Sequence, residues 1–403
     1  MAPFWRPKGR EGEGVSGLAG RAAIAGIGQT EFSKESGRSE LQLAAECITA
    51  ALRDAGLTPV DVDGLVTFTL DNNDEMEVGR TVGIDRLSMF ARIPYGGGAA
   101  AAVVLQAAMA VATGVCEVVV CYRAMNERSG LRFGNFDAGG GGALPPWLSW
   151  YAPYGLMTPA AWTGLAAMPY MERYGVTNAD FAPIAVVDRA HAATNPGAWF
   201  HGRPITVADH QASRWIIEPV LRLLDCCQES DGGVALVVTS VERARDLAQP
   251  PAVVRAAAQG ASYDAEMVTA YSRDDLTVLP DMAVVADQLW RQSGLTPADM
   301  DTAFLYDHFT PFVLMQLEEL GFCGRGEAKD FATVERLSVG GALPVNTSGG
   351  LLGEAYIHGM NGITEVVRQL RGTAVNQVPG VEHALVTAGT GVPTSGLILG
   401  VDR

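Results

Sequence analysis

The sequence predicts an α/β protein, a sandwich of helices and strands made of two similar halves. An eight-residue motif occurs twice, as Gly-Leu-Thr-Pro-Val-Asp-Val-Asp at residues 56–63 and as Gly-Leu-Thr-Pro-Ala-Asp-Met-Asp at residues 294–301. Each copy follows an amphipathic helical pattern and precedes an apolar, strand-like run. Gly-Leu-Thr-Pro is a common helix exit that can recur by chance, but eight aligned positions with the same flanking elements favour a duplication.

The pattern of apolar and capping residues also predicts where individual helices and strands lie. Ser39 followed by Gln42 has the form of a capping box, and Gly56 stands where a helix C-cap belongs, so a helix is expected between them. Residues 99–111 are almost entirely apolar, which predicts a helix buried on all sides. Strands are expected at residues 65–70, 118–121, 234–238, 303–306, 384–387 and 397–401.

These elements divide the chain into a flexible arm at residues 1–17, an N-terminal half at 18–250 and a C-terminal half at 251–403. Residues 125–216 interrupt the pattern and hold five of the seven tryptophans, namely Trp147, Trp150, Trp162, Trp199 and Trp215. Such an insertion is either a loop domain with its own aromatic cluster or a lid over an apolar pocket. We favour the lid, because an aromatic wall suits a bulky apolar substrate.

Composition excludes several classes of function. The formal charge of −16 disfavours nucleic acid as a partner. We find no apolar stretch long enough to span a bilayer and no apolar signal-peptide centre near the N-terminus, so a cytoplasmic protein without a membrane partner is expected. The six cysteines lack metal-type spacing and are expected to be inert thiols. The histidines and the glycines at 96–98 match no metal or dinucleotide pattern, so we expect no cofactor.

Three stretches resemble the thiolase superfamily, in the lipid-transfer branch related to sterol-carrier-protein thiolases. They are residues 21–29, residues 224–233 and the Asn-Thr-Ser-Gly-Gly turn at 346–350. The resemblance covers nearly the whole chain. It implies a duplicated αβαβα five-layer sandwich with an inserted loop domain, assembled as a homodimer through a thiolase-type interface.

The resemblance also identifies three catalytic positions that differ here from the thiolase pattern. The nucleophilic cysteine at the start of the buried helix corresponds to Gly97, the activating histidine to Tyr356 and the second acid/base cysteine to Ala388. Gly97 offers no nucleophile, so no acyl-enzyme is expected. The chain is then either a thiolase-like protein that only binds lipid or acyl-CoA, or an enzyme with different chemistry.

Tyr356 favours an enzyme, because a phenol stands in place of the acid/base group. A second phenol, Tyr306, begins a run that resembles the His-Asp-Cys-Phe loop of the family. Either tyrosine alone is more often a buried ring with a satisfied hydroxyl. The pair resembles the steroid side-chain aldolases of actinobacterial cholesterol catabolism. That resemblance implies retro-aldol cleavage of a steroid β-hydroxyacyl-CoA, of the 17-hydroxy-3-oxo-pregnene-carboxyl-CoA type, to a 17-keto steroid and propionyl-CoA.

A retro-aldol reaction needs a base for the hydroxyl, an acid for the α-carbon and donors for the enolate. We assign the acid/base work to Tyr306 and Tyr356, without deciding which is the base. His308 is a weaker candidate, either tuning Tyr306 or structural, and Asp307 is another, with the alternative of orienting the loop. The enolate is assigned to the amides of Gly97, Gly98 and Gly389.

Two expectations concern residues and proteins around this site. His358 is expected either to support Tyr356 or to be merely exposed. The resemblance also implies a small OB-fold acyl-CoA-binding partner associated with the steroid acyl-CoA hydratase. The acidic chain agrees with this, since it offers no obvious cationic cradle for the CoA phosphates.

Overall fold

The computed structural model of the protein describes residues 17–69, 73–94, 96–130, 132, 148–266, 270–391 and 394–402. The expected arm therefore lies outside the described residues except for Gly17, and so do Leu70 and Trp147. No helix in the described part of the chain is long and apolar enough to cross a membrane.

Helices and strands alternate along most of the chain. The strands are β1 (Ala22–Gln29), β2 (Gly64–Phe68), β3 (Met89–Ile93), β4 (Val118–Asn126), β5 (Trp215–Ile217), β6 (Leu221–Arg222), β7 (Asp231–Ser240), β8 (Ala252–Gly260), β9 (Thr302–Phe304), β10 (His383–Ala388) and β11 (Thr394–Val401). The α-helices are α1 (Glu40–Ala55), α2 (Glu75–Val82), α3 (Ala100–Ala112), α4 (Leu148–Tyr151), α5 (Pro159–Tyr174), α6 (Ala182–Thr194), α7 (Val207–Ala212), α8 (Val241–Arg245), α9 (Pro280–Ser293), α10 (Thr310–Glu319), α11 (Ala328–Phe331), α12 (Val334–Leu337), α13 (Gly350–Gly353) and α14 (Met360–Arg371). Short 3-10 turns are η1 (Pro59–Asp61), η2 (Gly97–Ala99), η3 (Ala152–Tyr154), η4 (Asn178–Phe181), η5 (Leu223–Asp225) and η6 (Pro297–Asp299).

The strand order shows the duplication directly. Within the described residues, one sheet has the order β3-β2-β4-β7-β1-β8-β11-β10-β9. Read outward from its centre, β1, β7, β4 and β2 correspond to β8, β11, β10 and β9. In each half the first two pairings are antiparallel and the third is parallel. The predicted duplicated α/β architecture is confirmed, whereas the boundaries proposed for the halves stay a prediction.

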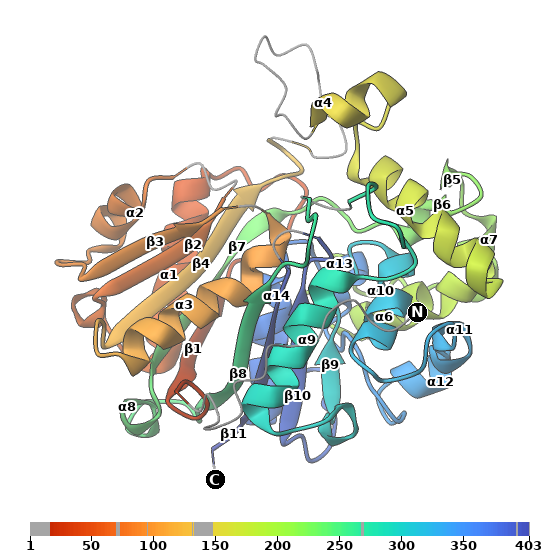
Figure 1. Ribbon diagram of the computed structural model, residues 1–403. Coiled ribbons are helices and arrows are strands. Elements are labelled where there is room, and N and C mark those ends of the chain that lie inside the picture. Colours follow the sequence, from red (N-terminus) through yellow and green to blue (C-terminus); the bar gives the residue numbers. More distant parts are fainter. Residues whose placement is uncertain are drawn as a thin grey trace.

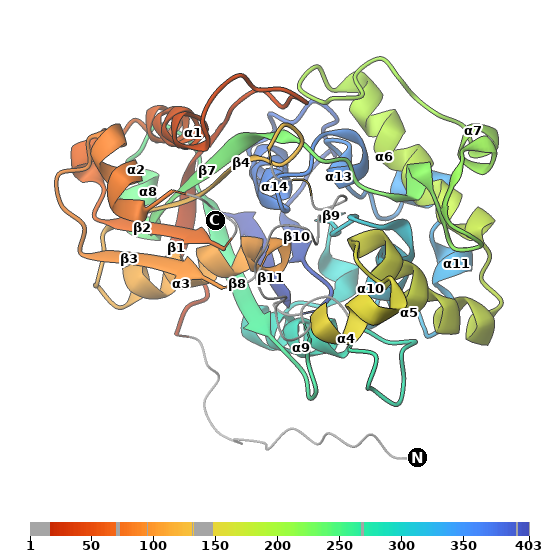
Figure 2. The same ribbon diagram turned by 90° about the horizontal axis from the view of Figure 1, so that it is seen from above.

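Helices cover both faces of each half of the sheet (Figures 1 and 2). Buried side chains of α3 and α14 share one apolar cluster with strands of both halves, so these two helices form the central layer. A second cluster joins α1 to the outer face of the first half, and a third joins α9 and α10 to the outer face of the second half. The result is a five-layer sandwich with α3 in its central layer. Most of α3 is buried, but the prediction of burial on all sides was wrong at Met109, which is 50% exposed.

The repeated motif folds in the same way twice. Gly56 and Gly294 end α1 and α9 with φ angles of 73° and 70°, a conformation that favours glycine. In the first copy the Thr58 hydroxyl donates to Asp61 at 2.8 Å. In the second copy Thr296 donates to Asp299 at 2.7 Å. The motif is therefore a helix exit followed by a capped turn that aims the chain into the next strand.

Some local predictions differ from the structure. Ser39 Oγ accepts from the backbone N–H of Gln42 at 3.1 Å, as a capping box requires, but the side-chain amide of Gln42 donates to Glu46 at 2.8 Å. The prediction was therefore right for Ser39 and wrong for the Gln42 side chain. The strand expected to reach Tyr306 ends at Phe304 as β9, because the backbone of Tyr306 is bound by side chains and not by a neighbouring strand.

The insertion at residues 125–216 carries α4 to α7 and ends in β5, which pairs with β6 just after it, and its tryptophans have different surroundings. Trp162 is buried within α5, whereas Trp150 is 73% exposed. The ring of Trp199 faces Lys34, and that of Trp215 faces Arg222. A role of this insertion as a lid stays a prediction.

Candidate active site

Tyr306 is held rigidly at the end of β9. Its N–H donates to the hydroxyl of Thr387 at 3.0 Å and to the side-chain oxygen of Gln316 at 3.3 Å. The amide of Gln316 donates in turn to the Tyr306 carbonyl at 2.9 Å. The side chain of Tyr306 is buried. Side chains of α10 and β10 thus bind both the N–H and the carbonyl of Tyr306, and this fixes the backbone from which the phenol extends.

Tyr356 lies in the segment between α13 and α14, and its side chain extends toward the hydroxyl of Tyr306. Its N–H donates to Ser230 Oγ at 3.2 Å, next to an isolated bridge between Glu229 and Tyr356. The hydroxyls of Tyr356 and Tyr306 are 2.9 Å apart, within hydrogen-bond distance. Two phenols separated by 50 positions in the sequence therefore meet as a pair.

Gly97 faces this pair from the turn η2, which leads into α3. A Cβ atom at residue 97 would lie 1.8 Å from the Tyr306 hydroxyl and 2.8 Å from its Cζ. The phenol thus fills the space that any side chain at residue 97 would need. The first turn of a buried helix also presents backbone N–H groups and the positive end of its dipole.

Burial raises the pKa of both phenols above the usual value of 10. A nearby carboxyl, Glu127, raises them further. Both hydroxyls therefore keep their protons at neutral pH. Each is a competent proton donor, and neither is ionised in advance as a base.

The two histidines near the pair are uncharged. The ring of His308 lies 4.7 Å from that of Tyr306 and stacks on Phe312 at 5.3 Å between centroids. Burial lowers the pKa of His308 to about 3, so its ring supplies no positive charge that would ionise Tyr306. His358 is 2% exposed and meets the ring of Tyr356 edge-on at 5.0 Å, which rules out the alternative of an exposed histidine. Burial and the charge of Arg123 lower the pKa of His358.

Asp307 and the remaining glycines occupy different places around the pair. The carboxylate of Asp307 accepts hydrogen bonds from the N–H groups of Leu351 and Leu352, at 2.9 and 3.0 Å. Asp307 thereby caps α13, a geometry that fits the orienting role. Gly389 follows β10 with a φ of 77°, and Gly98 is buried beside Gly97.

Sequence reasoning missed a second group of titratable residues near the phenols. Glu127, directly after β4, is 3% exposed, and burial raises its pKa well above 4.5. Burial lowers the pKa of Lys34 to about 8 and raises that of the Cys227 thiol. No motif marks Lys34 or Glu127, which lie in loops that only the fold brings to the site, whereas Cys227 belongs to the stretch 224–233 and was expected only to be an inert thiol. The described residues contain no cluster of His, Cys, Asp and Glu suited to a metal ion.

Fold and site together define a thiolase-like protein with two hydrogen-bonded phenols packed against Gly97. Residues 238–400 match the family described as "Thiolase C-terminal domain-like". A steroid side-chain-cleaving aldolase of Thermomonospora curvata is 64% identical over 96% of this chain and all of its own length. A 17-hydroxy-3-oxo-4-pregnene-20-carboxyl-CoA lyase of Mycobacterium tuberculosis is 63% identical over 95% of this chain and all of its own. The solved structure of an "Ltp2-ChsH2(DUF35) aldolase" covers 96% of this chain and 99% of its own at 63% identity, with a TM-score of 0.91. The chain therefore belongs to the family of these two lyases, within the thiolase superfamily.

Proposed function

We propose that the chain is an aldolase that cleaves a steroid β-hydroxyacyl-CoA by a retro-aldol reaction. The substrate is of the 17-hydroxy-3-oxo-pregnene-carboxyl-CoA type, and the products are a 17-keto steroid and propionyl-CoA. The names of the two relatives support the substrate class, because they share nearly two thirds of the residues over almost the full chain. The reaction involves no covalent acyl-enzyme.

One observation carries the chemical part of the proposal. The Tyr306 hydroxyl occupies the space of a side chain at Gly97 and meets the Tyr356 hydroxyl at 2.9 Å. The site has thus exchanged a nucleophile for a pair of proton-transfer groups. That pair suits a reaction that moves one proton and breaks one carbon–carbon bond.

Raised pKa values and a short hydroxyl–hydroxyl distance favour a proton relay over a phenolate base. One phenol takes the 17-hydroxyl proton while it passes its own proton to the other phenol. The O–H electron pair forms the ketone, and the bond between C17 and the α-carbon breaks to give the thioester enolate. The second phenol gives its own proton to the α-carbon of this developing enolate as it receives the proton of the first phenol, so neither phenol carries two protons at any point. No phenol has to be ionised beforehand, which fits the raised pKa values of Tyr306 and Tyr356.

The enolate oxygen is assigned to backbone amides. Gly97 and Gly98 open the first turn into α3, and Gly389 follows β10. Donors fixed in advance at a helix N-terminus stabilise developing negative charge without reorganisation.

The test is product formation by the chain with its partner. The steroid β-hydroxyacyl-CoA should give the ketone and propionyl-CoA, and Tyr306→Phe and Tyr356→Phe should each lower turnover by about a hundred-fold or more. Both variants should stay folded, because the ring packing is kept. If the chain binds the thioester but never cleaves it, a lipid-binding protein is the correct function. If both variants turn over normally, the phenols are structural.

We also propose two kinds of assembly. The first is a complex with an OB-fold acyl-CoA-binding protein associated with the hydratase, supported by the name of the solved relative, which joins Ltp2 to ChsH2(DUF35). The second is a homodimer at the edge strand β3, supported by the exposure of Phe90 on that strand, which is 58%. Light scattering of the chain alone and with the partner tests both, and a monomer that binds no OB-fold protein contradicts them.

A further inference from the structure

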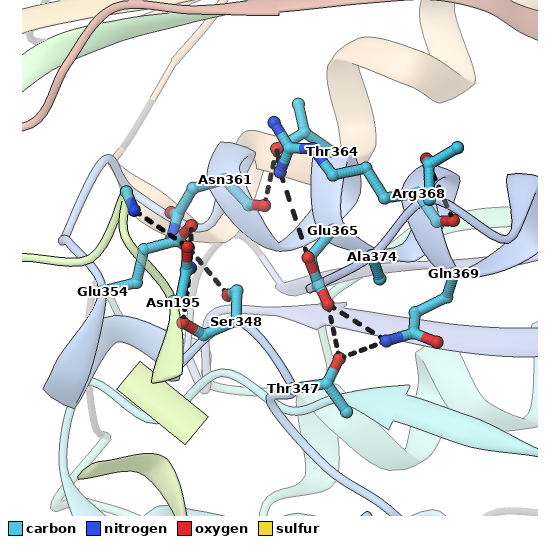
Figure 3. A network of polar contacts seen from close by, with 12 residues as sticks. Asn195, Thr347, Ser348, Glu354, Asn361, Thr364, Glu365, Arg368, Gln369 and Ala374 are labelled. Carbon is cyan, nitrogen blue, oxygen red and sulfur yellow. Dashed lines mark hydrogen bonds and ion pairs between the residues drawn. The ribbon is translucent and has the colours of Figure 1, made fainter. Parts of the chain in front are cut away.

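A buried polar network joins Asn195, Ser348 and Asn361 through one carboxylate (Figure 3). Its centre is Glu354, which is 1% exposed and stands two residues before Tyr356. One oxygen of Glu354 accepts hydrogen bonds from Ser348 Oγ and from Asn361 Nδ2, both at 2.8 Å. The other oxygen lies 3.5 Å from Asn195 Nδ2. Glu354 therefore joins the insertion, the turn at 346–350 and α14.

The network reaches the peptide group that carries Tyr356. Asn361 Nδ2 also donates to the carbonyl of Ala355 at 3.1 Å. That carbonyl and the Tyr356 N–H belong to the same planar peptide unit. Since the N–H is bound by Ser230 Oγ, this peptide plane is held at both of its ends.

The orientation of the Asn361 amide depends on Glu354. Among the described residues, Asn361 Oδ1 has no hydrogen-bond partner, although Asn361 is fully buried. A flipped amide would bring Oδ1 toward both the Ala355 carbonyl and the Glu354 carboxylate, and two acceptors facing each other are unfavourable. The carboxylate thus selects the orientation in which Nδ2 faces the peptide before Tyr356.

We propose that Glu354, acting through Asn361, is a positioning residue that sets the Tyr356 hydroxyl at hydrogen-bond distance from Tyr306. This inference rests on the proposed function, since it concerns the phenol pair of that reaction. Neither Glu354 nor Asn361 touches the substrate in this scheme. Their effect is to hold a 2.9 Å separation on which proton transfer depends.

A double-mutant cycle in the complex with the partner tests the proposal. Glu354→Gln and, separately, Asn361→Ala are combined with Tyr356→Phe, and single-turnover rates are measured. Each variant should lower kcat about ten- to a hundred-fold with KM nearly unchanged in the wild-type background. In the Tyr356→Phe background the same changes should cost less than about two-fold, because the hydroxyl that they position is gone.

The matched control is Glu365→Gln. Like Glu354, Glu365 is a buried carboxyl of this network, but its hydrogen bonds come from Thr347 and Gln369 and not from Asn361 (Figure 3). The Glu365→Gln variant should change the free energy of unfolding and leave kcat within about two-fold of the value for the unsubstituted chain. The proposal is overturned if Glu354→Gln and Asn361→Ala lower kcat equally in the wild-type and the Tyr356→Phe backgrounds. It is also overturned if Glu365→Gln lowers kcat as much as they do, because the network would then be merely structural.

A crystal structure of Glu354→Gln gives a readout independent of turnover. The two hydroxyls should be further apart than the 2.9 Å of the unsubstituted chain. An unchanged distance overturns the positioning role even if the aldolase activity is established. Absence of cleavage by the unsubstituted complex instead refutes the proposed function, so the two failures are distinguishable.

Discussion

Substituting Gly97 by alanine should disable the enzyme while leaving it folded. The added Cβ would lie 1.8 Å from the Tyr306 hydroxyl. Ordinary contact requires at least about 3.3 Å, so the phenol must move by about 1.5 Å. The Tyr306 backbone is bound by Gln316 and Thr387, so the ring has to rotate, and the 2.9 Å contact with Tyr356 is lost.

A misplacement of about 1 Å in a catalytic group can cost a hundred-fold in rate, which is about 3 kcal/mol of transition-state stabilisation. We therefore expect kcat of Gly97→Ala to fall by at least about a hundred-fold, measured as propionyl-CoA release by the complex. Overpacking should lower the free energy of unfolding by only about 1–3 kcal/mol, measured by urea denaturation.

Gly197→Ala is the matched control, because a Cβ there meets only Asn195 Oδ1, at 3.4 Å. It should turn over normally. The double variant Gly97→Ala/Tyr306→Phe should not regain activity, since the Cβ still meets Cζ at 2.8 Å after the hydroxyl is removed. Near-normal turnover by Gly97→Ala would refute the argument that the phenol fills this space.

Three further predictions follow from the same geometry. Intact-mass spectrometry during turnover should show an unmodified chain, and an adduct on any side chain would contradict the absence of an acyl-enzyme. Because burial raises the pKa of both phenols, kcat should be nearly flat from about pH 8 to about pH 10, whereas a phenolate base would give a rise of about ten-fold per pH unit. Burial raises the pKa of Glu354 from 4.5 to about 7, although Arg368 opposes and Glu365 assists this shift. The native state then binds this proton more tightly than the unfolded chain, so Glu354 should destabilise the fold as pH rises from about 4.5 through about 7, by about 3 kcal/mol in total. Urea denaturation should show that Glu354→Gln lacks this slope, and parallel pH profiles of the two chains would contradict it.

The fold was predictable because its signals are local and repeated. Gly56 and Gly294 mark two helix exits that need positive φ, and the apolar run of α3 predicts a helix in the core, most of whose residues are buried. The capping partner of Gln42 was not predictable, because Glu46 competes for its amide one turn later. The end of β9 was also missed, since the residues that bind the Tyr306 backbone lie in α10 and β10.

The candidate site was predictable only where the resemblance supplied positions. Tyr306, Tyr356 and Gly97 were identified in this way, and the structure brings them into contact. The network of Glu354 and Asn361 could not be predicted from the sequence, because a Glu and an Asn seven positions apart are typical of ordinary helix ends. Their burial, the hydrogen bond between them and the bond from Asn361 to the peptide before Tyr356 exist only in the folded chain.

The contact between Gly97 and Tyr306 links the loss of the nucleophile to the gain of the phenol pair. A cysteine at residue 97 would place its Cβ 1.8 Å from the Tyr306 hydroxyl, so nucleophile and phenol exclude each other. In the proposed correspondence with the thiolase pattern, a cysteine at residue 97 would displace Tyr306 and would leave Tyr356 and Ala388 in place of the activating histidine and the second cysteine. A single substitution at residue 97 is therefore expected to give neither thiolase activity nor aldolase activity. In the proposed reaction, the backbone amides at the start of α3 stabilise the thioester-derived enolate oxygen, which needs no side chain at residue 97.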